Sequence, residues 1–201
     1  MVIIGCGTGR CGSQSLANLF SIQENIAAYH ELYLQGPRYF GTTKSIRYLC
    51  NMNQSGYSKD EFISQFYNIV KDNKNKIIFD IGPYYIDIIE EIINWEDVKI
   101  ISLERNSDLF AKSLLDKYCN KSYHGFFKTE RFKNLLRYSL PDADAISEDD
   151  FLLFHKRFYS KLKDKRILKV KTEELNDESL TLKLSEFLNI DFKFEKFNIS
   201  K

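Results

Sequence analysis

The sequence has little net charge and few residues that form metal sites or disulfides. Its 29 Lys and Arg residues almost balance 28 Asp and Glu residues, and a formal net charge of +1 argues against a nucleic-acid-binding protein, which carries a basic field. The four cysteines include no C-x-x-C pair, and with three histidines they show no metal-ligand spacing. We therefore expect reduced thiols, no bound metal and a cytoplasmic protein.

Long apolar segments and internal repeats are also missing. No run reaches the roughly 18 apolar residues of a membrane-spanning helix, and Met1 leads directly into an apolar run with no charged leader before it. We therefore expect no transmembrane segment and no membrane anchor. Because no linker, repeat or low-complexity stretch divides the 201 residues, they predict a single domain, 1–201, with one sizeable core.

A glycine-rich stretch near the N-terminus is the most informative part of the chain. The apolar run 2–4 gives way to the polar and glycine-rich residues 5–15, and apolar residues resume at 16–20. This pattern predicts a buried strand, a loop and a helix that begins near Ser13. Glycines allow sharp turns and close approach to a ligand, and the first N–H groups of a helix carry partial positive charge. The stretch therefore predicts a phosphate-binding loop.

Two common phosphate loops match this stretch incompletely. The interval from Gly7 to Gly12 has the spacing of the nucleoside-triphosphate loop G-x-x-x-x-G-K-[ST], but Ser13 replaces its lysine. The same interval matches the dinucleotide fingerprint G-x-G-x-x-G, and Glu31 lies where a ribose-binding acid would. However, the strand stops at Gly5, and counting from there puts Arg10 in the place of the third glycine. A nucleotide kinase or an NAD-dependent enzyme is the weaker interpretation.

The loop resembles the 5′-phosphosulfate loop of sulfotransferases, which use 3′-phosphoadenosine 5′-phosphosulfate (PAPS). That loop follows an apolar strand and has the form [KR]-x-G-[TS]-x-[ST]-L, and the residues from Arg10 to Leu16 match it. The resemblance implies that Arg10 is catalytic, because a cation there stabilises charge that develops between sulfur and the departing phosphate. The loop residues implied to bind the cofactor are Gly9, Arg10, Cys11, Gly12, Ser13, Gln14 and Ser15.

A second motif follows the strand predicted over residues 98–105. Arg105 ends this strand, and Ser113 lies in the next predicted helix, whose cap is Asn106 or Ser107. The segment resembles the family's 3′-phosphate motif, [LV]-x-R-[ND]-P-x-x-x-x-x-S, with Ser107 in place of proline. The resemblance implies that the Arg105 guanidinium and the Ser113 hydroxyl bind one phosphate.

The end of the short strand predicted over 25–29 supplies candidates for the general base. His30 and Glu31 follow it, and the ends of parallel strands meet where ligands bind. Sulfotransferases need a base there to remove the proton of the acceptor hydroxyl. The resemblance favours Glu31, and His30 is the alternative. Burial and a nearby anionic cofactor would raise the pKa of Glu31 toward neutrality, as a general base requires.

The closing part of the chain extends the resemblance. A strand predicted over 166–171 leads into Thr172-Glu173-Glu174-Leu175, which is similar to the family's [YT]-E-[DE]-L segment, and a helix predicted over 180–188 follows. Asn198 corresponds to an Asn-x-Ser that approaches the nucleotide in many members. A turn at 82–85 is similar to the family's [TS]-P-x-Y turn, although Gly82 replaces its hydroxyl residue.

Strands alternate with helices along the chain, which predicts an α/β fold with a mostly parallel sheet, helices on both faces and a P-loop-NTPase-like architecture. The resemblance implies transfer of a sulfuryl group from PAPS to a sugar, phenol or lipid hydroxyl, with 3′,5′-bisphosphoadenosine (PAP) as product. It does not extend to 32–75 and 114–147, which we expect to form the acceptor region and a lid. A catalytically silent nucleotide-binding protein is a further alternative, and the acceptor and the oligomeric state stay open.

Overall fold

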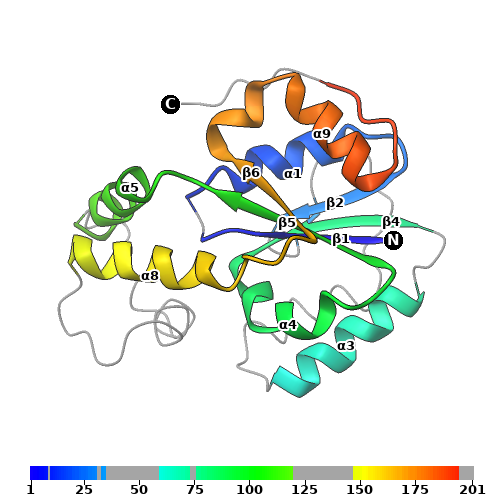
Figure 1. Cartoon of the computed structure of the whole chain (residues 1–201), viewed down its shortest axis with the longest axis horizontal. Helices are drawn as coiled ribbons and strands as arrows, with labels where there is room; N and C mark the ends of the chain where they lie inside the picture. The colour runs from blue at the N-terminus through cyan, green and yellow to red at the C-terminus, as the bar shows by residue number, and fades with distance from the viewer. Residues whose placement is uncertain (9, 31–32, 35–58, 73–75, 120–146, 195–201) are drawn as a thin grey trace.

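The computed structural model describes residues 1–8, 10–30, 33–34, 59–72, 76–119 and 147–194 (Figure 1). In these residues a six-stranded sheet has the order β3-β2-β4-β1-β5-β6. The strands are β1 (Val2–Cys6), β2 (Ile26–His30), β3 (Tyr33–Leu34), β4 (Ile77–Ile81), β5 (Val98–Glu104) and β6 (Ile167–Lys171). β3 is antiparallel to β2, and the other neighbouring pairs are parallel. The mostly parallel sheet that the sequence predicts is confirmed.

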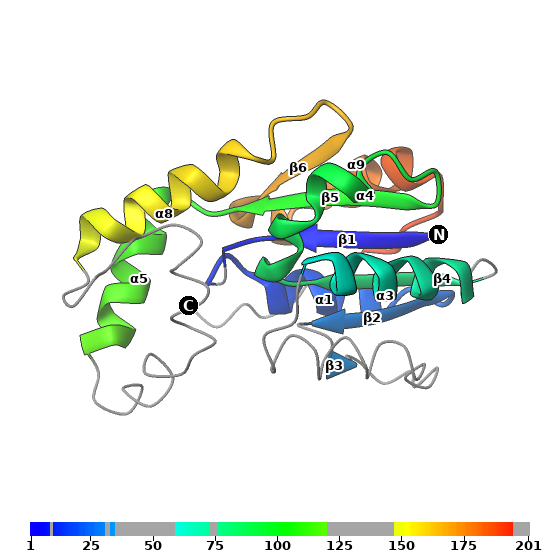
Figure 2. The same ribbon diagram turned by 90° about the horizontal axis from the view of Figure 1, so that it is seen from below.

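Helices cover both faces of this sheet (Figures 1 and 2). α1 (Ser13–Ser21) and α9 (Ser179–Leu188) lie on one face. The opposite face carries α3 (Lys59–Asp72), η1 (Pro83–Asp87), α4 (Ile89–Ile92), α5 (Ser107–Cys119) and α8 (Glu148–Ser160). A further 3-10 helix, η3 (Thr172–Asn176), follows β6. The helices on both faces confirm the predicted α/β architecture.

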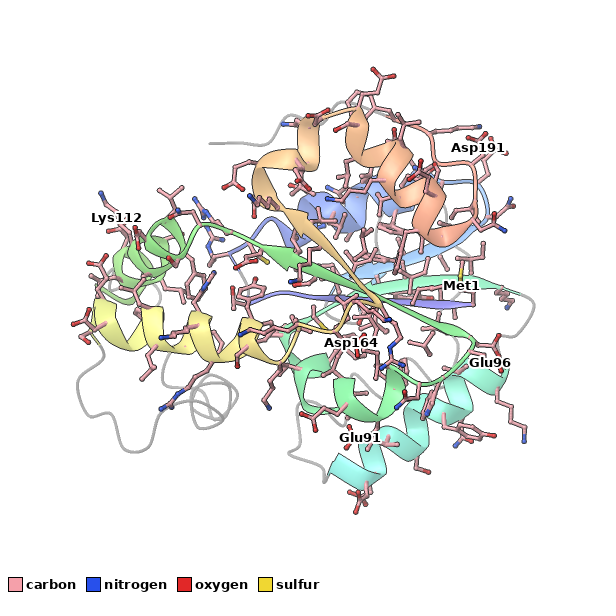
Figure 3. The ribbon with its side chains drawn as sticks, viewed as in Figure 1. Met1, Glu91, Glu96, Lys112, Asp164 and Asp191 are labelled. Carbon is pink, nitrogen blue, oxygen red and sulfur yellow. The ribbon has the colours of Figure 1, made fainter. Side chains whose placement is uncertain are left out.

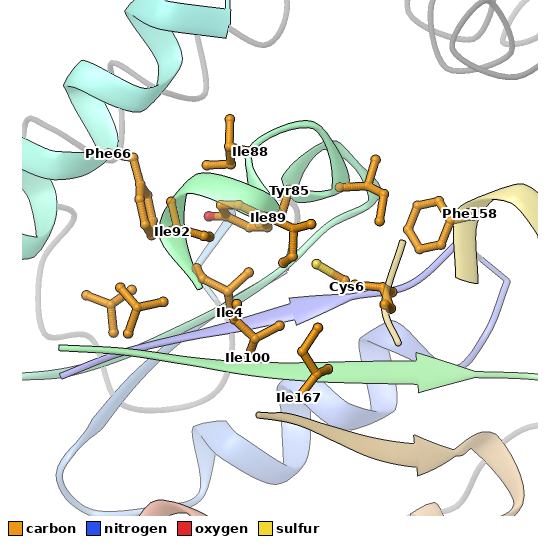
Figure 4. Packing of buried hydrophobic residues seen from close by; sticks show 14 of the residues in the cluster. Ile4, Cys6, Phe66, Tyr85, Ile88, Ile89, Ile92, Ile100, Phe158 and Ile167 are labelled. Carbon is orange, nitrogen blue, oxygen red and sulfur yellow. The ribbon is translucent and has the colours of Figure 1, made fainter. Parts of the chain in front are cut away.

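The two faces of the sheet bury separate apolar clusters. Along β1, Ile4 faces the cluster under α4 and α8, and Ile3 faces the cluster under α1 and α9, because strand side chains alternate. Figure 4 shows the first cluster closing around Ile4 and Ile100. In the second, the Phe20 and Phe79 rings stack with centroids 3.8 Å apart. Burial of each such side chain contributes about 1.5–3 kcal/mol.

Charged side chains from several elements lie outside these clusters (Figure 3), whereas the Asp80 side chain is buried. Lys112 on α5, Glu96 before β5 and Asp191 after α9 are all exposed. In the described part of the chain, no helix combines the length and apolar character that crossing a bilayer requires.

The helix predicted over 86–94 differs in the structure. The segment forms the 3-10 helix η1 followed by α4, which has only four residues. Ile88 separates them with φ −115° and ψ 3°, and its N–H donates to the carbonyl of Tyr85. The Tyr85 hydroxyl also donates to Asp80 at 2.8 Å inside the core. Tertiary contacts therefore determine the shape of this segment more than its apolar periodicity does.

Two other predictions concern segments that are only partly described. Residues 114–119, which the sequence assigns to the predicted lid over 114–147, instead continue α5, and Leu114 and Leu115 pack against the core. Residues 120–146, and the helix predicted over 42–52, lie outside the described residues.

Candidate active site

The predicted phosphate loop connects β1 to α1. β1 pairs with β5 as far as Cys6, and the chain then turns to start α1 at Ser13, as the sequence predicts. Gly12 has a φ of 85°, and a Cβ there would lie 2.7 Å from Leu175 Cδ1. Glycine is therefore required by both the backbone conformation and the packing of η3. At Gly7, a Cβ would lie 2.5 Å from the sulfur of Cys11.

Two consecutive carbonyl oxygens of the loop accept hydrogen bonds from side chains outside it. Arg105 Nη1 donates to the Arg10 carbonyl at 3.0 Å, and Thr172 Oγ1 donates to the Cys11 carbonyl at 2.6 Å. A carbonyl oxygen that faced a bound phosphate would repel it, whereas N–H groups attract it. Holding these carbonyls with other donors favours a loop that presents its N–H groups to an anion.

The loop therefore contacts the second predicted motif. Arg105 follows β5 directly, and its bond to the Arg10 carbonyl joins the end of β5 to the loop after β1. Asn106 caps α5, because its Oδ1 accepts from the N–H groups of Asp108 and Leu109, both at 3.1 Å. Of the two caps that the sequence leaves open, the structure shows Asn106.

The other residues predicted to bind the cofactor differ in exposure. Ser113 is half-buried in the middle of α5, and Arg10 is exposed. The remaining loop residues predicted to bind the cofactor begin α1. Gln14 is exposed and its Nε2 donates to Asn18 Oδ1 at 3.3 Å, while Ser15 is half-buried. Binding of a cofactor by these residues stays a prediction.

The end of β2 reaches the start of α1. His30 is the last residue of β2, and its Nε2 lies 2.9 Å from Ser13 Oγ, within hydrogen-bond distance. The structure thus brings one of the two candidate bases to the predicted phosphate loop. The other candidate, Glu31, and the predicted contact residues Gly9 and Asn198 lie outside the described residues.

Three successive carbonyl oxygens at the end of β5 also accept side-chain hydrogen bonds. Beyond Ser102 the neighbouring strand β1 has turned away into the loop. On α8, the Tyr159 hydroxyl donates to the Leu103 carbonyl, and His155 Nε2 lies 2.8 Å from the Arg105 carbonyl. Because a carbonyl only accepts, His155 carries its proton on Nε2 in this contact. The third carbonyl is that of Glu104, which lies between Leu103 and Arg105 in the chain, and Thr172 Oγ1 lies 3.2 Å from it.

The Tyr159 hydroxyl keeps its proton, and can therefore donate a hydrogen bond, because its pKa is raised. Burial is the main cause that raises this pKa well above its usual value, and the electrostatic interaction with Cys11 acts in the same direction. Hydrogen bonds with Thr8 act in the opposite direction and are weaker. The phenol is therefore protonated at neutral pH, in contact with both the loop and β5.

The sequence pattern does not single out His155, Tyr159 or the hydroxyl role of Thr172. The available signal was a pair of polar side chains four residues apart on the buried face of an amphipathic helix. Among the described residues, no three His, Cys, Asp or Glu side chains gather into a group that would hold a metal ion.

Comparison with solved structures identifies the fold. A sulfotransferase from Alicyclobacillus acidocaldarius superimposes with a TM-score of 0.53 and 14% identity, over 99% of this chain and 85% of its own. The chain has the sulfotransferase fold. A sulfotransferase domain from the curacin biosynthetic pathway gives a TM-score of 0.50 and 16% identity, over 97% of this chain and 75% of its own. No family model and no curated protein matches the sequence.

Within the sulfotransferase fold, the described site residues come from the ends of three parallel strands. The loop follows β1, Arg105 follows β5 and His30 ends β2, so all of them lie at the carboxyl edge of the sheet. Ligands of open parallel sheets bind at this edge. The arrangement suits an elongated anionic ligand that spans the loop and Arg105.

Proposed function

We propose that this protein is a sulfotransferase that uses PAPS to modify a hydroxyl group of a small-molecule, carbohydrate or lipid acceptor. The observation that carries the proposal is the 3.0 Å bond from Arg105 Nη1 to the Arg10 carbonyl. It joins the loop proposed for the 5′-phosphosulfate to the residue proposed for the 3′-phosphate. A nucleotide with phosphates at both positions requires two adjacent anion sites of this kind, and the sulfotransferase fold supports the assignment.

In the proposed reaction, the acceptor oxygen attacks sulfur and the bond from sulfur to the bridging oxygen breaks. The electron pair of that bond goes to the 5′-phosphate of the departing PAP. Arg10 and the N–H groups of the loop stabilise this charge, and Arg105 and Ser113 hold the 3′-phosphate. Much of the rate comes from holding the two substrates in line. PAPS is the co-substrate, and the proposal requires no metal.

The acceptor proton passes to a general base at position 30 or 31. The sequence favours Glu31, and the 2.9 Å approach of His30 Nε2 to Ser13 Oγ supplies an argument for His30. Histidine often serves as a general base near neutral pH, and this contact places His30 beside the loop proposed for the phosphosulfate. Both residues therefore stay in the proposal, and a pair of variants distinguishes them.

A thermal-shift panel tests the cofactor assignment. PAP at one hundred times its dissociation constant stabilises the fold by about 2.7 kcal/mol, which corresponds to a rise in Tm of roughly 5–10 °C for a chain of this size. We expect this rise with PAP and smaller effects with ATP and NAD. A rise with ATP or NAD, and none with PAP, would contradict the proposal. The cytoplasmic location inferred from the cysteines stays a prediction.

Turnover is tested separately from binding. PAPS is incubated with panels of sugars, phenols and lipids that bear hydroxyl groups, and release of PAP is measured against a reaction without acceptor. Release that depends on one acceptor class would identify the substrate. Binding of PAP without release on any panel would instead support a nucleotide-binding protein without catalysis.

A further inference from the structure

We infer that Thr172 is a positioning residue that fixes the spacing between the two phosphate sites, an inference that rests on the proposed function. Its hydroxyl lies between two main-chain carbonyls, 2.6 Å from that of Cys11 and 3.2 Å from that of Glu104. Cys11 belongs to the loop proposed for the 5′-phosphosulfate. Glu104 immediately precedes Arg105, the residue proposed for the 3′-phosphate.

The position of Thr172 in the fold suits this role. It begins η3 directly after the edge strand β6, and β6 pairs with β5 up to Glu104. In the same short helix, Leu175 is buried against Gly12, where a Cβ would approach it to 2.7 Å. The Thr172 methyl group also faces Gly12, at 3.2 Å from the same Cβ position. η3 therefore holds the loop by packing, and the Thr172 hydroxyl joins it to β5.

A hydroxyl has one proton, so Thr172 shares it between two acceptors. Its contact with Cys11 is short, and its contact with Glu104 is longer and weaker. Without the hydroxyl, both carbonyls lose a donor in a partly buried environment, and the loop is free to shift relative to β5. The loop has other contacts, so we expect the shift to be small.

The consequence for binding depends on how many phosphates a ligand has. When one phosphate is bound, a fixed spacing presents the second site to the second phosphate at high effective concentration. A ligand with both phosphates benefits from this spacing, whereas a ligand with one phosphate does not. Loss of the Thr172 hydroxyl should therefore weaken PAP more than either adenosine monophosphate.

The test compares Thr172→Val, which keeps the shape and removes the donor, with Thr172→Ser, which keeps the donor. Calorimetry measures binding of PAP, adenosine 5′-monophosphate and adenosine 3′-monophosphate. For Thr172→Val we expect PAP to bind about tenfold more weakly, the 5′-monophosphate about threefold, and the 3′-monophosphate nearly unchanged. Thr172→Ser should bind PAP within about twofold of the wild type.

A matched control is Thr181→Val on α9. Thr181 is also buried, and its hydroxyl donates to a carbonyl, but to that of Glu178, the residue that caps the start of its own helix. This variant removes a buried threonine hydroxyl away from the loop, so PAP binding should not change. Circular dichroism establishes that all variants are folded.

Several results would overturn the inference. Equal losses for PAP and the 5′-monophosphate would make Thr172 a residue of the loop alone, and unchanged PAP binding in Thr172→Val would remove it from the site. If Thr172→Val does not fold, Thr172→Ser decides: a tenfold loss there would assign the effect to the methyl group. A wild-type protein that binds ATP and not PAP would contradict the proposed function itself, before any variant is compared.

Discussion

Removal of the Arg105 side chain should affect two nucleotides by different amounts. In the proposed complex its guanidinium binds the 3′-phosphate, and in the structure it also donates to the Arg10 carbonyl at 3.0 Å. Arg105→Ala therefore removes one contact with the ligand and one contact with the loop. PAP depends on both contacts, whereas adenosine 5′-phosphosulfate has no 3′-phosphate and depends only on the second.

The magnitudes follow from the types of bond. A charge-assisted bond to a phosphate contributes about 1.5–3 kcal/mol, and a bond to a neutral carbonyl about 0.5–1.5 kcal/mol. Arg105→Ala should therefore weaken PAP by roughly 2–4 kcal/mol and adenosine 5′-phosphosulfate by only about 0.5–1.5 kcal/mol. Arg105→Lys keeps the charge and loses the forked geometry, so its loss for PAP should be intermediate.

Titration calorimetry with both nucleotides measures these losses. Arg166→Ala is the control, because Arg166 lies just before β6, at the opposite end of that strand from η3. It is exposed and pairs with Asp164, which Figure 3 shows at the turn between α8 and β6. Equal losses for the two nucleotides in Arg105→Ala would refute the assignment of Arg105 to the 3′-phosphate.

Three further predictions concern turnover and stability. Arg10→Ala should lower turnover by about a hundredfold and PAPS affinity much less, because the contact of Arg10 with the bridging oxygen strengthens as that oxygen becomes anionic. Single-turnover kinetics measures turnover and affinity separately. Glu31→Gln should abolish turnover and His30→Asn should reduce it slightly, with nucleotide binding intact in both; the reverse pattern would assign the base to His30. Tyr159→Phe should lower the free energy of unfolding by about 1 kcal/mol in urea denaturation, because the Leu103 carbonyl loses its donor; an unchanged midpoint would mean that water replaces it.

The sheet could be predicted because buried parallel strands are continuous apolar runs. Adjacent isoleucines, such as Ile3 with Ile4 and Ile100 with Ile101, bury side chains on both faces of the sheet. Polar and glycine residues at the strand ends then located the loop and Arg105. The ends of β1 and β5 lie within two residues of the positions that the sequence predicts.

The contacts that hold the site could not be predicted in the same way. His155 and Tyr159 contact β5 because β1 leaves the sheet at Cys6 and uncovers carbonyls of its neighbour. Which carbonyls lack a strand partner depends on the pairing of segments far apart in the sequence, and a pattern within one segment does not reveal it. For the same reason, local periodicity predicted a regular helix around Ile88, where tertiary contacts produce two short ones.

The contact between Thr172 and the Cys11 carbonyl spans 161 residues, and this separation has a consequence for synthesis on the ribosome. Contacts between distant segments form late, because closing a long loop of chain costs entropy before the contact is gained. A nascent chain that has emerged only through α8 already contains the whole glycine-rich loop but not the hydroxyl that holds it. We therefore expect nucleotide affinity to rise once β6 and η3 have emerged and the Thr172 hydroxyl can reach the Cys11 carbonyl.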